Sequence, residues 1–153
     1  MSKKSKIIYL ILTTVFFTVF NFYFSDIIMK KGFLLAENPV LDIVYLQNSG
    51  AAFNLFEGYK IFLIIFAFFA LAGLIFYIVK HIKKVSTICL FYTAMLMSGI
   101  FSNMCERLFL GYVRDFIKLN FIDFPIFNIS DIFINIGVLG LIIIIIKNSY
   151  FKK

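Results

Sequence analysis

The sequence predicts an all-α polytopic membrane protein with four transmembrane helices and a small extracytoplasmic β-element and loop. Hydrophobic residues make up 62% of its 153 residues and charged residues only 15%, whereas soluble domains are about 45–50% apolar and about 25% charged. Four apolar stretches are long enough, or nearly so, to cross a hydrocarbon core of about 30 Å as helices. This composition excludes a disordered chain, a nucleic-acid-binding module and most soluble enzymes.

The four apolar stretches are expected to be the spans of a single membrane domain that covers residues 1–153. They run over residues 7–24, 61–79, 85–104 and about 127–146. Three lysines precede the first stretch, as in a signal peptide, but bulky residues and Asp26 follow it where a cleavage site needs small residues. The first stretch is therefore expected to remain as an anchor.

The placement of charge orients the chain in the membrane. Nine lysines and no acidic residue lie before the first span, between the second and third spans, and after the fourth. These lysines are Lys3, Lys4, Lys6, Lys80, Lys83, Lys84, Lys147, Lys152 and Lys153. All eight acidic residues lie in the other two loops, about residues 25–60 and 105–126, or at their membrane edges. The positive-inside rule therefore predicts that both termini are cytoplasmic and that these two loops face outward.

The first outer loop carries the sequence pattern of a strand. Leu41–Leu46 is rich in β-branched and aromatic residues, and the turn sequence Asn48-Ser49-Gly50 follows it. We expect a small β-element at the outer membrane surface.

Polar side chains recur on one face at the start of the fourth span. Asn128, Asp131 and Asn135 have the spacing i, i+3, i+7, which places them on one side of a helix. Polar residues inside a span are costly and indicate a functional site. The alternative is that Asp131 is an N-terminal acid stabilised by the helix dipole. The two asparagines favour a polar site inside the helix bundle.

The end of the third span repeats this pattern. Asn103 and Arg107 are four residues apart and share a helix face. Thirteen lysines but only two arginines occur in the chain. A planar guanidinium is the donor suited to bidentate recognition, so we assign Arg107 to the polar site and Arg114 to the headgroup level.

Asp115 lies between the third and fourth spans and is either an ordinary loop acid or a partner of Asp131. Neighbouring antiparallel spans place both acids at the outer membrane boundary. Two carboxylates at close range share one proton, so one can act as a base on water while the other acts as an acid. His81 falls on the cytoplasmic side, and Cys89 and Cys105 have no metal-ligand spacing. This chemistry therefore needs no His, Cys, metal or cofactor.

Five short segments resemble, in order, the signature elements of the lipoprotein signal peptidases, the type II signal peptidases of bacteria. The family patterns are D-x-x-x-K, N-x-G-A-A-F, G-N-x-x-D-R, V-V-D-F and F-N-x-A-D. The matching segments are Asp26–Lys30, Asn48–Phe53, Asn103–Arg107, Val113–Phe116 and Phe127–Asp131. The match is distributed over nearly the whole chain.

The resemblance implies a membrane-embedded aspartyl endopeptidase that removes signal peptides from diacylglyceryl-modified prolipoproteins. It implies a multi-pass protein of the bacterial cytoplasmic membrane with its active site near the outer face. The expected partners are these substrates and membrane lipid, with no nucleic acid, metal or cofactor, and the protein is expected to be a monomer. The catalytic residues implied are Asp115 and Asp131. The supporting residues implied are Asp26, Lys30, Asn48, Gly50, Asn103, Arg107 and Asn128.

Four positions depart from the family pattern. Ser102 stands in place of Gly, Glu106 of Asp, Arg114 of Val and Ser130 of Ala. Arg114 is expected to lower the pKa of Asp115 if the two side chains approach each other.

Three other functions compete with the peptidase. A catalytically degenerate paralogue that binds lipid-modified peptides would have lost one of the two aspartates. A transporter or channel subunit needs polar residues through the whole depth of the membrane, and Leu139–Ile146 offers none. A Ser–Lys hydrolase would use Ser49 and Lys30, but no nucleophile elbow supports it.

Overall fold

The computed structural model describes residues 1–31, 39–51 and 55–150 of the chain. In chain order these residues form α1 (Lys3–Lys31), β1 (Leu41–Asn48), α2 (Lys60–His81), α3 (Thr87–Phe109), β2 (Val113–Leu119) and α4 (Ile129–Tyr150). All four helices are long and apolar enough to cross a membrane. The predicted fold class is confirmed. The helices are longer than the predicted spans, most clearly at α1, which continues beyond residue 24 to Lys31.

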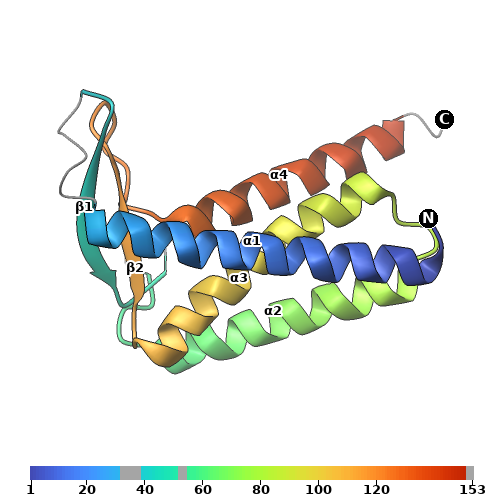
Figure 1. The fold of residues 1–153 in the computed structure, drawn as a ribbon, viewed down its shortest axis with the longest axis horizontal. Coiled ribbons are helices and arrows are strands. Elements are labelled where there is room, and N and C mark those ends of the chain that lie inside the picture. The colour runs from blue at the N-terminus through green and yellow to red at the C-terminus, as the bar shows by residue number, and fades with distance from the viewer. Residues whose placement is uncertain (32–38, 52–54, 151–153) are drawn as a thin grey trace.

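The helices run alongside one another with the sheet at one end of the molecule (Figure 1). The beginning of α1, the turn between α2 and α3, and the end of α4 lie at the opposite end (Figure 1). Lys6 ties two of these parts together, because its Nζ donates to the carbonyl oxygens of Ile82 and Lys83 at 3.2 Å each. The lysine-rich segments described by the structure therefore share one end, as the predicted topology requires.

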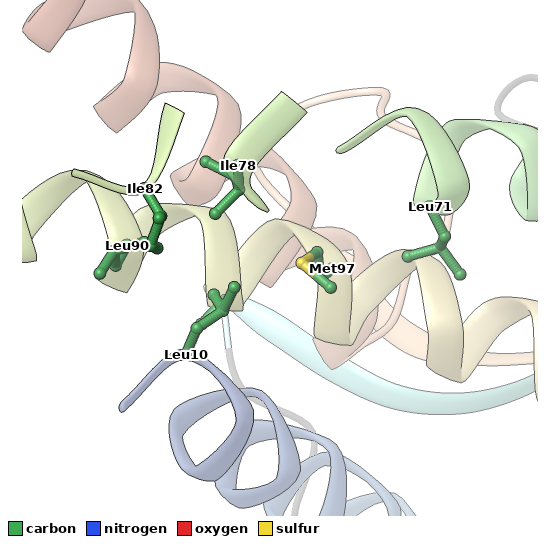
Figure 2. Packing of buried hydrophobic residues seen from close by; sticks show 7 residues of the cluster. Leu10, Leu71, Ile78, Ile82, Leu90 and Met97 are labelled. Carbon is green, nitrogen blue, oxygen red and sulfur yellow. The ribbon is translucent and has the colours of Figure 1, made fainter. Parts of the chain in front are cut away.

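Helix α3 is the centre of the bundle and packs against α1, α2 and α4. Its side chains Leu90 and Met97 belong to a buried cluster with residues of α1, α2 and the turn that follows α2. Figure 2 shows the members of that cluster from these other parts, Leu10, Leu71, Ile78 and Ile82. The outer faces of α1 and α2 expose large apolar side chains such as Phe16 and Phe66, as expected for surfaces solvated by lipid.

Helices α3 and α4 approach each other closely at small residues. A Cβ added to Gly99 would overlap the carbonyl oxygen of Ser130, and one added to Gly137 would lie 2.8 Å from the backbone nitrogen of Leu96. Small residues are the usual means by which helix backbones approach in membranes. This contact fixes the first turn of α4 against α3.

Strands β1 and β2 pair in antiparallel orientation, with Leu46 opposite Asp115 and Asn48 opposite Val113. The strand predicted at Leu41–Leu46 is confirmed and continues to Asn48. Two parts of the segment expected as an outer loop, residues 105–126, have regular secondary structure. Residues 105–109 still belong to α3, and β2 occupies Val113–Leu119. Local sequence does not reveal this strand because its partner is β1, more than sixty residues earlier in the chain.

The chain returns along β2 before α4 begins. The backbone N–H of Ile117 donates to the carbonyl oxygen of Phe127 at 2.8 Å, and the N–H of Phe127 donates back to Ile117 at 3.1 Å. Phe127 lies only two residues before α4. This pairing brings the first turn of α4 beside the middle of β2, where Asp115 lies.

Candidate active site

Asp115 is held between two asparagine side chains from other elements. Its side chain is almost fully buried, with the residue 1% exposed. Asn48 Nδ2 donates to Asp115 Oδ2 at 2.7 Å, and Asn128 Nδ2 donates to Asp115 Oδ1 at 2.7 Å. Asn48 pairs with Val113, two residues before Asp115 in β2. Asn48 and Asp115 are therefore diagonal neighbours in the sheet, and their side chains lie on the same face.

Asp131 and Asn128 form a reciprocal cap at the start of α4. The side-chain Oδ1 of Asn128 accepts from the backbone N–H of Asp131 at 3.0 Å, and Asp131 Oδ2 accepts from the backbone N–H of Asn128 at 3.1 Å. This is the geometry of a capping box, in which the residue before the helix and the third helical residue satisfy each other's N–H groups. Asp131 is therefore a helix-terminal acid through Oδ2, which takes part in this cap. Its other oxygen, Oδ1, accepts a hydrogen bond from α3.

Asn103 connects α3 to the same carboxylate. Its Nδ2 donates to Asp131 Oδ1 at 2.9 Å, and its Oδ1 accepts from Asn128 Nδ2 at 3.3 Å. Asn128 thus uses one amide hydrogen for Asp115 and the other for Asn103. The two aspartates are therefore joined through one asparagine.

Arg107 anchors the turn that follows β1. Its Nη2 donates to the carbonyl oxygen of Gly50 at 2.6 Å, and its Nη1 donates to the carbonyl oxygen of Asn103 at 3.2 Å. Gly50 is buried, and its N–H donates to Asn48 Oδ1 at 2.9 Å. The Asn48 amide is therefore oriented by this turn while it donates to Asp115. The predicted N-x-G-A-A-F match runs over Asn48–Phe53. Its last two residues, Ala52 and Phe53, lie outside the described residues.

Burial raises the pKa of Asp115 to about 6 from its ordinary value of 3.8. The hydrogen bond from Asn48 opposes this rise, while the nearby charge of Asp131 adds to it. At pH 7 a carboxyl group with a pKa of about 6 is protonated in about a tenth of molecules, against fewer than about one in a thousand for the ordinary value of 3.8. The lowering of this pKa by Arg114 is expected only if the two side chains approach each other, and the guanidinium of Arg114 is paired with Glu106 instead.

A cavity of about 830 Å³ opens beside the two aspartates. Its polar wall consists of Asn48, Asn103, Arg107, Asp115, Asp131 and Asn135. The remaining wall is apolar and comes mostly from the segment between β2 and α4, including Phe121, Ile122, Phe124 and Phe127. Sites for organic ligands are typically about 300–1,000 Å³ with a few polar groups on an apolar lining. Within this segment, the sequence motifs point to Phe127 but not to the other residues of the cavity wall.

Two of the predicted supporting residues lie away from this cavity. Lys30 Nζ is paired with Asp26 Oδ2 at 2.6 Å on the surface of α1, where the two side chains are 72% and 51% exposed. Neither residue lines the cavity. The structure therefore brings together Asn48, Gly50, Asn103, Arg107, Asp115, Asn128 and Asp131, and leaves the Asp26–Lys30 pair outside.

Comparisons with known proteins show the family to which the chain belongs. A family model described as "Signal peptidase (SPase) II" matches residues 7–147. The lipoprotein signal peptidase of Streptococcus thermophilus strain CNRZ 1066 is 40% identical over 110 residues, which is 72% of this chain and 71% of that protein. The lipoprotein signal peptidase of Fusobacterium nucleatum is 36% identical over 135 residues, 85% of this chain and 80% of that protein.

Solved structures give the same result. A bacterial membrane enzyme solved by the in meso method at 2.3 Å is similar with a TM-score of 0.81 and 30% identity, over 94% of this chain and 91% of that one. A second, solved at 1.9 Å, has a TM-score of 0.71 and 28% identity over 90% and 92% of the two chains. The shared fold, the family match along almost the whole sequence and the named relatives together place this chain in the signal peptidase II family, whose members are multi-pass bacterial membrane proteins that cleave signal peptides from lipoproteins.

Proposed function

We propose that this chain is an aspartyl endopeptidase in which Asp115 and Asp131 together cleave the signal peptide of diacylglyceryl-modified prolipoproteins. The observation that carries the proposal is the position of Asn128, which bonds to both carboxylates at the polar end of an apolar cavity. Groups held in this way have a fixed geometry relative to each other before substrate binds.

The mechanism uses one proton shared by the pair. The ionised carboxylate removes a proton from a water molecule, whose oxygen attacks the carbonyl carbon of the scissile peptide. The protonated carboxyl group gives its proton to the carbonyl oxygen, and a tetrahedral intermediate forms. The intermediate then collapses and the C–N bond breaks, while the amine nitrogen takes a proton from the dyad and one hydroxyl group of the intermediate returns its proton to the dyad, which restores the shared proton. The pKa of about 6 supports Asp115 as a group that exchanges a proton near neutral pH more readily than an ordinary carboxyl group does.

The surrounding polar groups support substrate positioning. Asn48 and Asn103 each fix one oxygen of a carboxylate, so the remaining lone pairs face the water and the substrate. Arg107 lines the cavity, and its Nε is buried without a hydrogen-bond partner among the described residues. A peptide carbonyl is the acceptor that such a donor requires.

The apolar wall supports recognition of lipid as well as peptide. Burying apolar surface contributes roughly 25 cal/mol per Å², and the phenylalanines between β2 and α4 offer such a surface next to the dyad. A substrate that carries acyl chains on the residue beside the scissile bond gains this energy, whereas an unmodified peptide does not. We place this end of the molecule at the outer face of the bacterial cytoplasmic membrane, on the basis of the lysine distribution.

The experiment uses the purified full-length protein with one prolipoprotein supplied in diacylglyceryl-modified and unmodified forms. We expect cleavage of the modified form only, and no cleavage by Asp115→Asn or Asp131→Asn. The double variant should be little worse than either single variant, since residues that act as one unit are non-additive. Asn128 remains the N-cap in Asp131→Asn, and the amide oxygen of an asparagine at position 131 can still accept from the backbone N–H of Asn128, so this variant keeps the cap of α4. Substantial activity in Asp131→Asn would show that Asp131 only caps the helix. If the unaltered protein bound the modified prolipoprotein without cleaving it, the result would favour the degenerate paralogue.

A further inference from the structure

Glu106 makes three charge-assisted hydrogen bonds with a single residue of β2. Its Oε1 accepts from Arg114 Nε at 2.8 Å and from Arg114 Nη2 at 2.6 Å, and its Oε2 accepts from the backbone N–H of Arg114 at 2.7 Å. The side chains are only 8% and 20% exposed. Exposed ion pairs contribute little to stability, but a largely buried pair held by several hydrogen bonds fixes geometry and is costly to break.

The residue held in this way directly precedes Asp115. The backbone bond to Glu106 fixes the peptide that leads into Asp115, so it limits how far β2 can slide or rotate against α3. The next residue of α3, Arg107, holds the turn after β1 through Gly50. Consecutive residues of α3 therefore hold β2 and the end of β1 separately. A two-stranded sheet is at best marginally stable by itself, so such anchors decide where its side chains lie.

We propose that Glu106 and Arg114 are positioning residues for Asp115. Neither touches the scissile bond; together they hold the Asp115 carboxylate at the distance from Asn128 and Asp131 that the dyad requires. The inference rests on the proposed function of that dyad.

The test compares Glu106→Gln, Arg114→Val and the double variant in the purified protein with the modified prolipoprotein. Glu106→Gln keeps the shape of the side chain but replaces one acceptor oxygen by an amide N–H₂ group, which cannot accept a hydrogen bond from Arg114. Arg114→Val removes the guanidinium and keeps the backbone N–H that Glu106 binds. Misplacing a reacting group by about 1 Å can cost about a hundredfold in rate. We expect kcat to fall by about tenfold to a hundredfold in each single variant with KM changed less than about twofold. The double variant should be no slower than Arg114→Val, because it no longer buries an unpaired carboxylate.

Two control variants separate positioning from general stability. Asp42→Asn removes an ion pair between the same two strands, Lys118 Nζ to Asp42 Oδ2 at 3.9 Å, in a more exposed position, and should leave kcat unchanged. Arg114→Lys keeps the charge but not the two guanidinium donors, and should restore only part of the activity that Arg114→Val loses. Thermal unfolding in detergent is measured for every variant, so that kcat is compared between folded proteins.

Two results would overturn the inference. The first is a normal kcat in folded Glu106→Gln and Arg114→Val. The second is a fall in kcat that follows the melting temperature equally in all variants, Asp42→Asn included. Activity in Asp115→Asn is a separate outcome, which would refute the proposed function itself.

Discussion

Asn128 donates its side-chain amide to Oδ1 of Asp115 at 2.7 Å across thirteen residues of sequence. The same asparagine caps α4 through the backbone N–H of Asp131. One side chain thus determines both where the fourth helix begins and how the carboxylate of β2 is oriented.

The two roles of Asn128 can be separated by substitution. Ser is also a good residue for a helix N-cap, but its short hydroxyl group does not reach Asp115. Asn128→Ser should therefore retain the melting temperature within a few degrees and lose about tenfold to a hundredfold in kcat. Asn128→Ala should lose the same activity and also about 1 kcal/mol of stability from the missing cap. Equal activity in Asn128→Ser and the unaltered protein would show that the amide bond to Asp115 has no part in the reaction.

The stability of the protein should depend on the ionisation of Asp115. The folded pKa of about 6 is above the ordinary value of 3.8, so between these two pH values the folded state binds more protons than the unfolded state. The free energy of unfolding therefore falls as the pH rises from about 4 to about 6, by about 3 kcal/mol in total for this group. Asp115→Asn removes this dependence and should melt at a higher temperature than the unaltered protein at pH 8, but at a similar temperature near pH 4.

Thermal unfolding in detergent across this pH range measures the effect. The difference between Asp115→Asn and the unaltered protein isolates Asp115, because all other titrating groups are common to both. Asp42→Asn serves as a control from the same sheet. Parallel curves for Asp115→Asn and the unaltered protein would contradict the raised pKa.

Gly99 should tolerate no side chain. A Cβ at this position overlaps the carbonyl oxygen of Ser130, so Gly99→Ala must push the first turn of α4, and Asp131 with it, away from α3. We expect a loss of about 1–3 kcal/mol in stability and a large loss of activity. Gly73 in α2 has nothing within 4 Å of an added Cβ, so Gly73→Ala should be neutral or slightly stabilising. If both variants behaved alike in melting and cleavage assays, the close approach of α3 and α4 would not matter for the site.

The orientation in the membrane can be read with reporters. A reporter fused after residue 153 should report a cytoplasmic location, and one inserted near Gly58 an external location, because the lysine-rich segments lie at the end of the bundle opposite the sheet (Figure 1). The reverse pattern would place the aspartates on the cytoplasmic face and exclude the proposed encounter with exported lipoproteins.

The sequence by itself determined the membrane fold class, the four helices and most of the polar site. Long apolar stretches, lysine placement and helical spacing are local properties, so spacing alone assigns Asn103 with Arg107, and Asn128 with Asp131, to shared helix faces. The capping role of Asp131 also follows from its place at the start of a helix. That role is compatible with the polar site, because the two oxygens of one carboxylate serve the cap and the bond to α3 separately.

Only the tertiary structure decided how Asp115 is held and which charges are partners. Strand β2 exists because it pairs with β1 and with Phe127, and such distant pairing leaves little trace in local sequence. The pairing of Arg114 with Glu106, and not with the adjacent Asp115, follows from the position of α3 beside β2. The pairing of Asp26 with Lys30 is different, because these residues lie four apart on an exposed face of α1 and helix geometry alone brings them together. Contacts between sequence neighbours follow from local geometry. The partners of buried polar groups depend instead on how the elements pack, because a buried polar group without a hydrogen bond costs free energy.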